Sequence, residues 1–203
     1  MRRIIGSAIA AAILFAASAL AASNNPPSDH NDAFVPGPQN ESELAKQIRH
    51  NLLMLPYYSI FDDLAFKLDG TVVTLEGACP PEAPWDIKSA AERAVRKVPG
   101  VTQVINNIKL LPLSSMDWQI RRAMVRKIYG NGSIGMRYGY QALPSIHIIV
   151  DNGHVTLEGV VDNQFDKQLI GTLANTVPYV FSVTNNLVVQ NEGNSDKKSK
   201  KSS

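Results

Sequence analysis

Residues 64–77 read LAFKLDGTVVTLEG, and residues 146–159 read IHIIVDNGHVTLEG. A constant offset of 82 aligns the two stretches, and both end in TLEG. A second pair follows in the same order at an offset of 79, with VPGVTQVINN at residues 98–107 and VPYVFSVTNN at residues 177–186. Two matches in the same order indicate a duplicated module, which must be recognised before any local pattern is interpreted.

Each copy carries the same succession of apolar patterns. Apolar residues recur at helical spacing in four segments, at residues 42–55, 85–97, 117–128 and 162–177. They alternate along one hairpin in each copy and along a later segment, at residues 101–110 and 180–190. Asp69-Gly70 and Asn152-Gly153 mark the hairpin turns, because Gly accepts a positive φ. We therefore predict an α+β protein of two tandem α-β-β-α-β modules, each a three-stranded sheet covered by two helices.

Side chains that accept a hydrogen bond from the first helical turn predict where helices begin. Ser42, Asp117 and Asp162 are the expected N-caps. The apolar stripe of the last helix is expected at Phe165, Leu169, Leu173 and Val177. Each module is small and so has a small core, and we expect the halves to pack on each other with pseudo-twofold symmetry.

The first residues are typical of a secretory signal peptide. Arg2 and Arg3 precede an apolar, Ala-rich segment that ends in ALA at residues 19–21. We predict a signal peptide at residues 1–21, with an uncleaved anchor as the alternative. No Cys lies near the cleavage site, so the protein is not expected to be a lipoprotein. Its expected location is the periplasm or the medium.

Two polar segments flank the repeats. Residues 22–41 are rich in Pro, Asn and Ser, which predicts a disordered linker. Residues 191–203 form a Lys-rich tail that is also predicted to be disordered. The domains are accordingly expected at residues 42–112 and 115–190.

The charge balance argues against a nucleic-acid partner. The chain has 20 Lys+Arg and 18 Asp+Glu, and loss of Arg2 and Arg3 with the signal peptide leaves 18 of each. A nucleic-acid binder usually has a basic excess. Cys79 is the only Cys, so no intramolecular disulfide can form and stability must come from packed cores. Cys79 is expected in a loop, either as a half-buried spectator or as a thiol open to intermolecular pairing.

The two hairpins, together with VPGVTQVINNIKL and VPYVFSVTNNLVV, resemble the BON domain, the module of osmotically induced periplasmic proteins. The resemblance implies tandem BON domains that bind without catalysing a reaction, with phospholipid or envelope association as the usual role. It implies no catalytic residue and no cofactor. One position departs from the family, because Tyr179 stands where Gly is usual. We expect this change to alter the turn before the last strand.

The candidate metal ligands do not form a repeated set. His147 and His154 are predicted on one outward face of the second hairpin, with His147 opposite Glu158. Such cross-strand pairs are ordinary stabilisers of a sheet. The first hairpin has Ala65 and Val72 at these positions, and zinc usually takes three or four convergent ligands. We therefore predict no metal site.

The repeated acids do not indicate catalysis. Glu76 and Glu158 follow inward-facing Leu residues, so both are expected to point outward into solvent. Catalysis would require a nucleophile beside a base, or paired carboxylates in a pocket, and the sequence shows neither pattern. We predict that the protein is not an enzyme.

The strongest interaction candidate is the basic helix near Asp117, with the insertion at residues 130–143 that the first copy lacks. Cations beside amphipathic aromatic side chains suit an anionic lipid surface. The predicted lipid- or anion-binding residues are Trp118, Arg121, Arg122, Arg126, Lys127, Tyr138 and Tyr140. The alternative is a solvated helix face, with the aromatic residues packed between the domains.

Two functional hypotheses follow from these patterns. The favoured one is an extracytoplasmic binding protein that associates with the cell envelope, through an anionic phospholipid surface or an envelope protein. The alternative is a structural or stress-protective protein that acts through protein–protein contacts.

Overall fold

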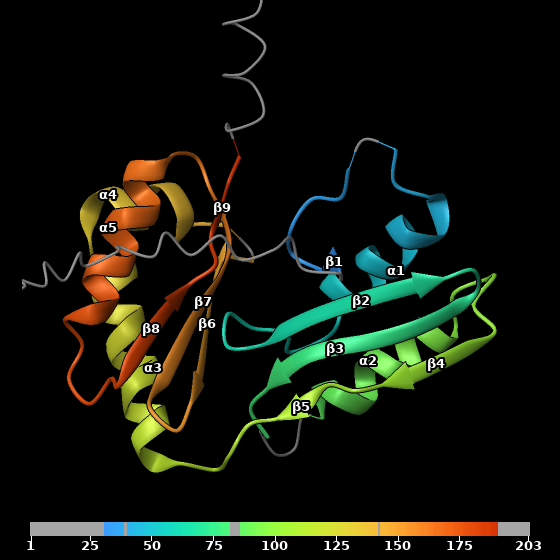
Figure 1. Cartoon of the computed structure of the whole chain (residues 1–203), viewed down its shortest axis with the longest axis horizontal. Helices are drawn as coiled ribbons and strands as arrows, with labels where there is room; N and C mark the ends of the chain where they lie inside the picture. Colours follow the sequence, from blue (N-terminus) through green and yellow to red (C-terminus); the bar gives the residue numbers. More distant parts are fainter. Residues whose placement is uncertain (1–30, 39, 82–85, 142, 191–203) are drawn as a thin grey trace, which may run out of the picture.

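The computed structural model describes residues 31–38, 40–81, 86–141 and 143–190, which form two units of similar design. The predicted signal peptide and Lys-rich tail lie outside these residues. The first unit consists of β1 (Asn31–Asp32), α1 (Glu43–Leu53), β2 (Asp63–Asp69), β3 (Val72–Cys79), α2 (Ile87–Arg96), β4 (Gln103–Asn106) and β5 (Lys109–Leu110). The second consists of α3 (Ser115–Tyr129), α4 (Gly132–Tyr138), β6 (Ile146–Asp151), β7 (His154–Val161), α5 (Gln164–Asn175), β8 (Ser182–Asn185) and β9 (Val188–Val189). In each unit the helices lie on one face of a sheet (Figure 1), which confirms the predicted α+β fold of two sheet-and-helix modules.

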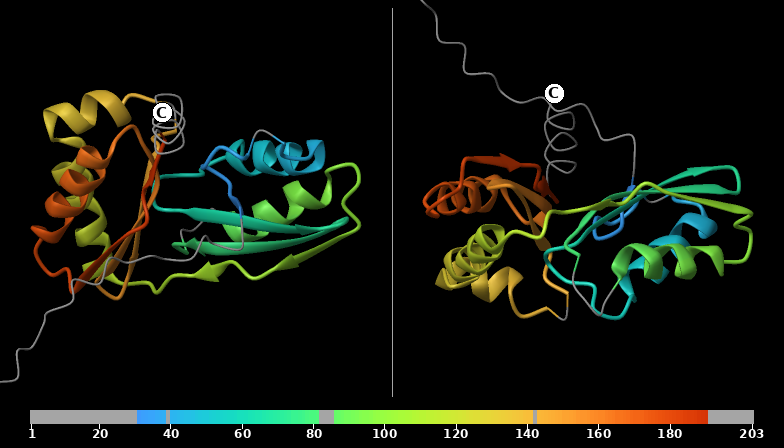
Figure 2. Two further views of the ribbon diagram at one scale, coloured as in Figure 1. Left: turned by 45° about the horizontal axis from the view of Figure 1, so that its top comes forward. Right: turned by 90° about the horizontal axis from the view of Figure 1, so that it is seen from below.

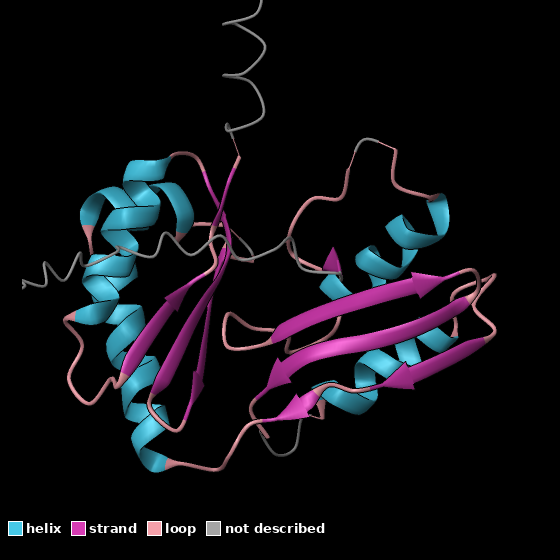
Figure 3. Cartoon of the chain, in the orientation of Figure 1, coloured by secondary structure: helices cyan, strands magenta, loops and turns pink. Residues whose placement is uncertain are grey.

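Both sheets combine an antiparallel hairpin with a parallel strand (Figure 3). β2 pairs antiparallel with β3, and β4 and β5 pair parallel with β3. The second sheet repeats this arrangement with β6, β7, β8 and β9. A parallel pair needs a crossover, and α2 and α5 supply it. The last strand predicted in each copy is divided into two short segments.

The hairpin turns occur where the sequence predicts them. Asp69 pairs with Val72, and Gly70 in the turn has φ +58. In the second hairpin Asn152 and Gly153 have φ values of 51 and 79. Two successive positive φ angles define a type I′ turn, which matches the natural twist of a hairpin.

Each unit has its own hydrophobic core between its helices and one face of its sheet. The first core includes Ile48, Leu52, Phe66, Val73, Leu75, Ala91, Val95 and Ile108. The second includes Ile120, Met124, Ile128, Ile148, Val150, Leu157, Ile170, Ala174 and Leu187. The single thiol lies at the end of β3 rather than in a loop. Cys79 is 1% exposed, and burial raises its pKa to about 12, so it is kept as an unreactive thiol.

Two of the three predicted helix caps are wrong. The Oγ of Ser42 accepts a hydrogen bond from the amide of Ala45, as predicted. The cap of α3 is Ser114, whose Oγ lies 3.1 Å from the amide nitrogen of Asp117. The cap of α5 is Asn163 rather than Asp162. In both cases another polar side chain nearby in sequence accepts the hydrogen bond from an amide of the first helical turn.

Asp117 stabilises the second hairpin instead of capping a helix. Its side chain is 1% exposed, and its carboxylate accepts hydrogen bonds from the amides of Asn152 and Gly153, both at 2.9 Å. A buried carboxylate needs such donors. The helix of the first unit has Ala45 at the corresponding position. This contact therefore joins α3 to the turn between β6 and β7 in the second unit.

The predicted stripe is one residue out of phase within α5, although Val177, which follows the helix, is buried as predicted. Phe165 is 68% exposed, and the buried positions of α5 are Asp166, Ile170, Gly171 and Ala174. The cause is α4, which forms within the insertion that the first copy lacks. Its Tyr138 donates a hydrogen bond of 2.6 Å to the Asp166 carboxylate, so this acid faces inward in place of the aromatic ring.

Part of the predicted linker is folded. Asn31 and Asp32 add a short strand to the edge of β2, and Ala33 is 1% exposed. Arg49 of α1 donates to the carbonyl of Ala33 at 3.2 Å and pairs with Glu41 at 2.7 Å. An edge strand offers unpaired backbone groups, and this segment uses them. The prediction of disorder is therefore wrong for the described residues of this segment.

The units pack end against face, so the expected pseudo-twofold symmetry is wrong. Figure 2 shows one end of the first sheet directed at the helix-free face of the second. Ile148 of β6 donates a backbone hydrogen bond of 2.7 Å to the carbonyl of Ile60, which precedes β2. A twofold relation would place the same surfaces in contact on both units. The contact instead covers β6 with a loop of the first unit.

Replacing Asp117 with Ala should lower the free energy of unfolding by about 2–3 kcal/mol, because it leaves the buried amide of Gly153 and the partly buried amide of Asn152 without their acceptor. Chemical denaturation would measure the loss. Asp69→Ala removes an exposed acid beside the first hairpin turn and should change stability by less than about 0.5 kcal/mol. Equal losses in the two variants would contradict this role of Asp117.

Candidate functional site

Ionisable side chains meet where the two units touch. His147 of β6 is 0% exposed, and the ring of Phe34 stacks on it with centroids 4.2 Å apart. Its Nδ1 lies 2.7 Å from the carbonyl oxygen of Asp62. His147 does pair opposite Glu158, as predicted, but it does not face solvent. Only His154 of this pair is exposed, because the first unit covers the face around His147.

Burial changes the ionisation of this cluster. Loss of solvent, together with the charges of Asp32 and Glu158, raises the pKa of Asp63 to about 8. Glu158 is half-buried and accepts a hydrogen bond of 2.7 Å from Asn186, so the prediction of a solvated carboxylate is wrong for this residue. Loss of solvent raises its pKa to about 7. Burial lowers the pKa of His147 to about 4. The interface therefore favours neutral side chains.

The interface cluster does not have the features of a metal site. Within the described residues, no group of three or more His, Cys, Asp or Glu side chains is placed to hold a metal ion. The one histidine of the cluster has its Nδ1 at the carbonyl oxygen of Asp62 and its ring stacked on Phe34. Perturbed pKa values also arise in structural contacts, and here they accompany the packing of one unit on the other.

A different surface is open to ligands. α3 directs Ile120, Met124 and Ile128 into the core and carries Arg122, Arg126 and Lys127 exposed on its other side. Three adjoining hollows lie along this side, with volumes of about 360, 410 and 250 Å³. They are lined by Ser115, Trp118, Gln119, Ile120, Arg122, Ala123, Arg126, Lys127, Thr176, Val177, Pro178 and Tyr179. We call this surface the α3 groove. None of its lining residues is acidic.

The structure brings four of the seven predicted binding residues to the α3 groove: Trp118, Arg122, Arg126 and Lys127. Trp118 is 38% exposed, and its ring meets Phe61 edge-on. Among the described residues, no ion pair involves Arg122, Arg126 or Lys127, so their charges are not neutralised by acids of this surface. The groove therefore combines concentrated positive charge with an indole ring.

The other three predicted residues lie elsewhere. Arg121 is 2% exposed, and its guanidinium donates a 2.7 Å hydrogen bond to the carbonyl of Val150. Tyr138 is 3% exposed, and its hydroxyl donates a hydrogen bond to the carboxylate of Asp166. Tyr140 is 86% exposed but follows α4 and does not line the groove. A helix turns by about 100° per residue, which places Arg121 and Arg122 on different faces.

Sequence reasoning missed the far wall of the groove. Pro178 and Tyr179, after α5, line it opposite α3. Tyr179 has φ +67, and the corresponding Gly100 has φ +96. The expected change of turn is therefore wrong, because both copies keep the same left-handed conformation. The available signal was a bulky residue at a position where glycine is usual.

A family comparison covers the first unit from residue 40 and the second unit from residue 137, after α3. The model of the BON domain matches residues 40–112 and 137–191, which is more than half of the chain. The chain belongs to the BON domain family. BON domains are known for association with phospholipid and the cell envelope, and the family is in general non-catalytic. The resemblance read from the repeated motifs is thereby confirmed.

Comparison with solved structures finds distant likenesses to this BON protein. Two solved structures of CdsD, described as a structural protein of the type III secretion system of Chlamydia trachomatis, are each 13% identical to it. They cover 77% and 74% of this chain and 98% of their own chains, with a TM-score of 0.30 in both cases. A likeness at this level carries no argument. No curated protein matches the chain. None of the described helices has the length and hydropathy to cross a membrane.

The interface acids should make stability fall as pH rises. A raised pKa in the folded state means that the stabilising contribution of Asp63 is full below about pH 3.8 and is lost as pH rises through about 8. Glu158 acts in the same direction through about pH 7. His147 has the opposite effect, because its lowered pKa means that its contribution to stability is present above pH 6.5 and is lost as pH falls towards 4. Between pH 5 and pH 8 the combined loss from the two acids is larger than the gain from this one imidazole. The melting temperature should therefore be lower at pH 8 than at pH 5.

The variant Asp63→Asn should reduce this fall, because an amide does not ionise. Glu76→Gln is the control, since Glu76 is the first-unit counterpart of Glu158, pairs with Lys67 at 3.5 Å and is not among the charges that raise the pKa of Asp63 or Glu158. Melting temperatures that rise from pH 5 to pH 8, or a fall that Asp63→Asn leaves intact, would show that the interface acids do not control stability.

Proposed function

We propose that this BON protein binds anionic phospholipid surfaces of the cell envelope through the α3 groove, outside the cytoplasm and without catalysis. The observation that carries the proposal is the set of three exposed cations, Arg122, Arg126 and Lys127, beside Trp118 on a surface without lining acids. The family's association with phospholipid and the envelope supports the same conclusion. The predicted signal peptide at residues 1–21 would take the protein to that compartment.

The charges of the groove suit phosphate. A guanidinium binds phosphate oxygens through two parallel hydrogen bonds, whereas an ammonium acts as a point charge. Each basic residue near an anionic surface contributes about 1 kcal/mol, so three contribute about 3 kcal/mol, or roughly a hundredfold in affinity. Attraction of this origin weakens as salt screens the charges.

Apolar side chains at the N-terminal end of α3 fit the same role. Leu113 is 86% exposed, Met116 43% and Trp118 38%. They are close in sequence, immediately before and within the first turn of the helix. Trp rings are enriched at the boundary between lipid headgroups and acyl chains, where apolar neighbours can enter the acyl region. This end of the helix would enter the headgroup layer while the arginines bind phosphate.

A second candidate is a structural or stress-protective role through protein contacts. Met136, Tyr140 and Phe165 are 75%, 86% and 68% exposed, on or beside α4 and α5. Exposed apolar patches often mark protein interfaces. Cross-linking in the native envelope would favour this role if it captured one protein through Phe165 and none through α3.

Flotation with vesicles of phosphatidylglycerol and phosphatidylethanolamine tests the lipid proposal. The double variant Arg122→Glu with Arg126→Glu should lose binding at low salt by at least tenfold, because two attractive charges become repulsive. Raised salt should weaken binding of the wild-type protein.

The matched control is Arg93→Glu with Lys97→Glu, which makes the same change of charge on exposed residues of the first unit. It should bind as the wild-type protein does. Absence of wild-type binding at low salt would overturn the proposal, and so would equal losses in the two double variants.

A further inference from the structure

Tyr179 is held in a backbone conformation that suits glycine. Its φ of +67 is uncommon for a bulky side chain, because the Cβ atom crowds the backbone there. Its ring is 67% exposed, so core packing does not explain the choice of tyrosine. Gly100 occupies the same position in the first unit without this strain. The second unit therefore keeps a strained aromatic residue at its surface.

The surrounding contacts maintain this conformation. The amide of Phe181 donates a 2.9 Å hydrogen bond to the carbonyl of Gly153, which fixes the segment after Tyr179 to the hairpin turn. A Cβ atom on Gly153 would lie 3.3 Å from the carbonyl oxygen of Tyr179, so the two turns are closely apposed. Asp117 in turn binds the amide of Gly153. Strain of this kind clusters at functional sites. Tyr57 in the first unit has a similar φ of 69 and is 58% exposed, so what distinguishes Tyr179 is its place beside the α3 groove.

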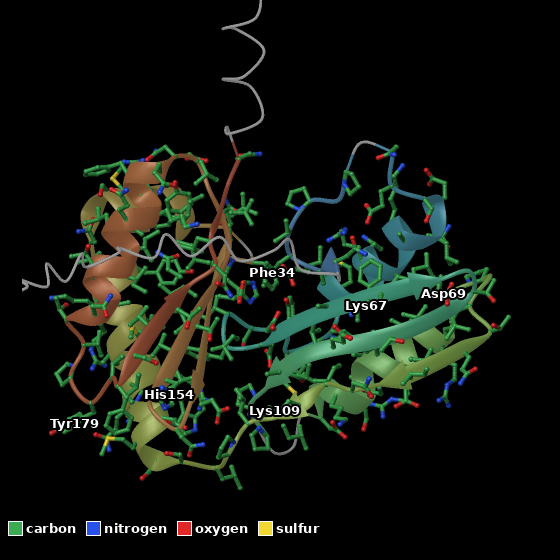
Figure 4. The ribbon with its side chains drawn as sticks, in the orientation of Figure 1. Phe34, Lys67, Asp69, Lys109, His154 and Tyr179 are labelled. Carbon is green, nitrogen blue, oxygen red and sulfur yellow. The ribbon has the colours of Figure 1, made fainter. Side chains whose placement is uncertain are left out.

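The strained residue borders the α3 groove. Pro178 and Tyr179 line the hollow of about 360 Å³ together with Arg122 and Arg126. Figure 4 shows Tyr179 projecting from the second unit on the side away from the first unit. The hollow is therefore bordered by two elements, α3 with its two arginines and the turn after α5 with Tyr179.

The two copies differ at all of these positions together. The alignment places His50 where Arg122 stands, Met54 where Arg126 stands, and Gly100 where Tyr179 stands. The three replacements lie on two separate elements, α3 and the turn after α5, and they meet only in the folded second unit. The combination of a tyrosine with two arginines at this hollow is therefore specific to the second unit.

We propose that Tyr179 contacts ligand, and that with Arg122 and Arg126 it forms a subsite for the phosphodiester headgroup of one anionic lipid. The guanidinium groups bind the phosphate oxygens, and the ring packs on the glycerol carbons of the headgroup. The inference rests on the proposed lipid function and adds a defined headgroup site to it.

Two variants separate a ligand contact from a structural role. Tyr179→Gly removes the ring and the strain, and Tyr179→Asn removes the ring but tolerates the left-handed conformation. Both should melt at or above the wild-type temperature and should bind phosphatidylglycerol vesicles about tenfold more weakly. Tyr179→Phe keeps the ring and should bind within about threefold of wild type. A parallel fall of melting temperature and binding would overturn the proposal.

A soluble probe tests the subsite separately from the membrane surface. Dihexanoyl phosphatidylglycerol, below its micellar concentration, should shift the NMR signals of Arg122, Arg126 and Tyr179 in the wild-type protein. The shifts should be lost in Tyr179→Gly. Glycerol 1-phosphate should bind at least tenfold more weakly, and equal binding would identify a soluble phosphate ester as the ligand and overturn the lipid assignment.

The outcomes distinguish the two proposals. If the Arg122→Glu, Arg126→Glu variant loses vesicle binding while Tyr179→Gly retains it, the subsite is wrong and the lipid function stands. If the wild-type protein binds vesicles but the short-chain lipid shifts none of the three NMR signals, the subsite is likewise wrong and the lipid function stands. If the wild-type protein binds neither vesicles nor the short-chain lipid, both proposals fall.

Discussion

The packing of the two units depends on covering the helix-free face of the sheet in the second unit. Its own helices cover one face only, yet β6 is buried from Ile146 to Val150. The first unit covers that face around His147 with the ring of Phe34 and the carbonyl of Asp62, and it pairs with the free edge of β6 through the Ile60–Ile148 backbone bond. Because an uncovered apolar strand would expose both side chains and backbone groups, this contact fixes how the units are oriented.

This orientation gives the two copies different roles. The first unit docks through the loop before β2 and through Phe34, which follows β1. In the second unit Trp118 of α3 meets Phe61 of that loop, whereas Arg122, Arg126, Lys127 and Tyr179 are exposed. Asp117 joins α3 to the turn at Tyr179 through the hairpin turn at Gly153. The two copies of the module therefore differ in role. The first covers β6 of the second, and the second carries the exposed cations.

The sequence predicts what is local and repeated, and fails where distant parts meet. Alternation around TLEG correctly places Leu75 and Leu157 in the cores, and the turn residues fix the pairing of His147 with Glu158. The burial of His147 could not be predicted, because its cover comes from Phe34 and Asp62, far away in the chain. A helix phase known to within one residue could not separate the inward residue 121 from its outward neighbour. The groove's second wall was missed because it forms only on folding.

Paramagnetic broadening by a spin-labelled phosphatidylglycerol in vesicles tests the central claim of an asymmetric pair most directly. The NMR signals of α3 from residue 118 to residue 127, and of residues 178–180, should broaden strongly, while those of β2 and β3 in the first unit should not. Equal broadening of the two units, or broadening confined to the first, would contradict the account.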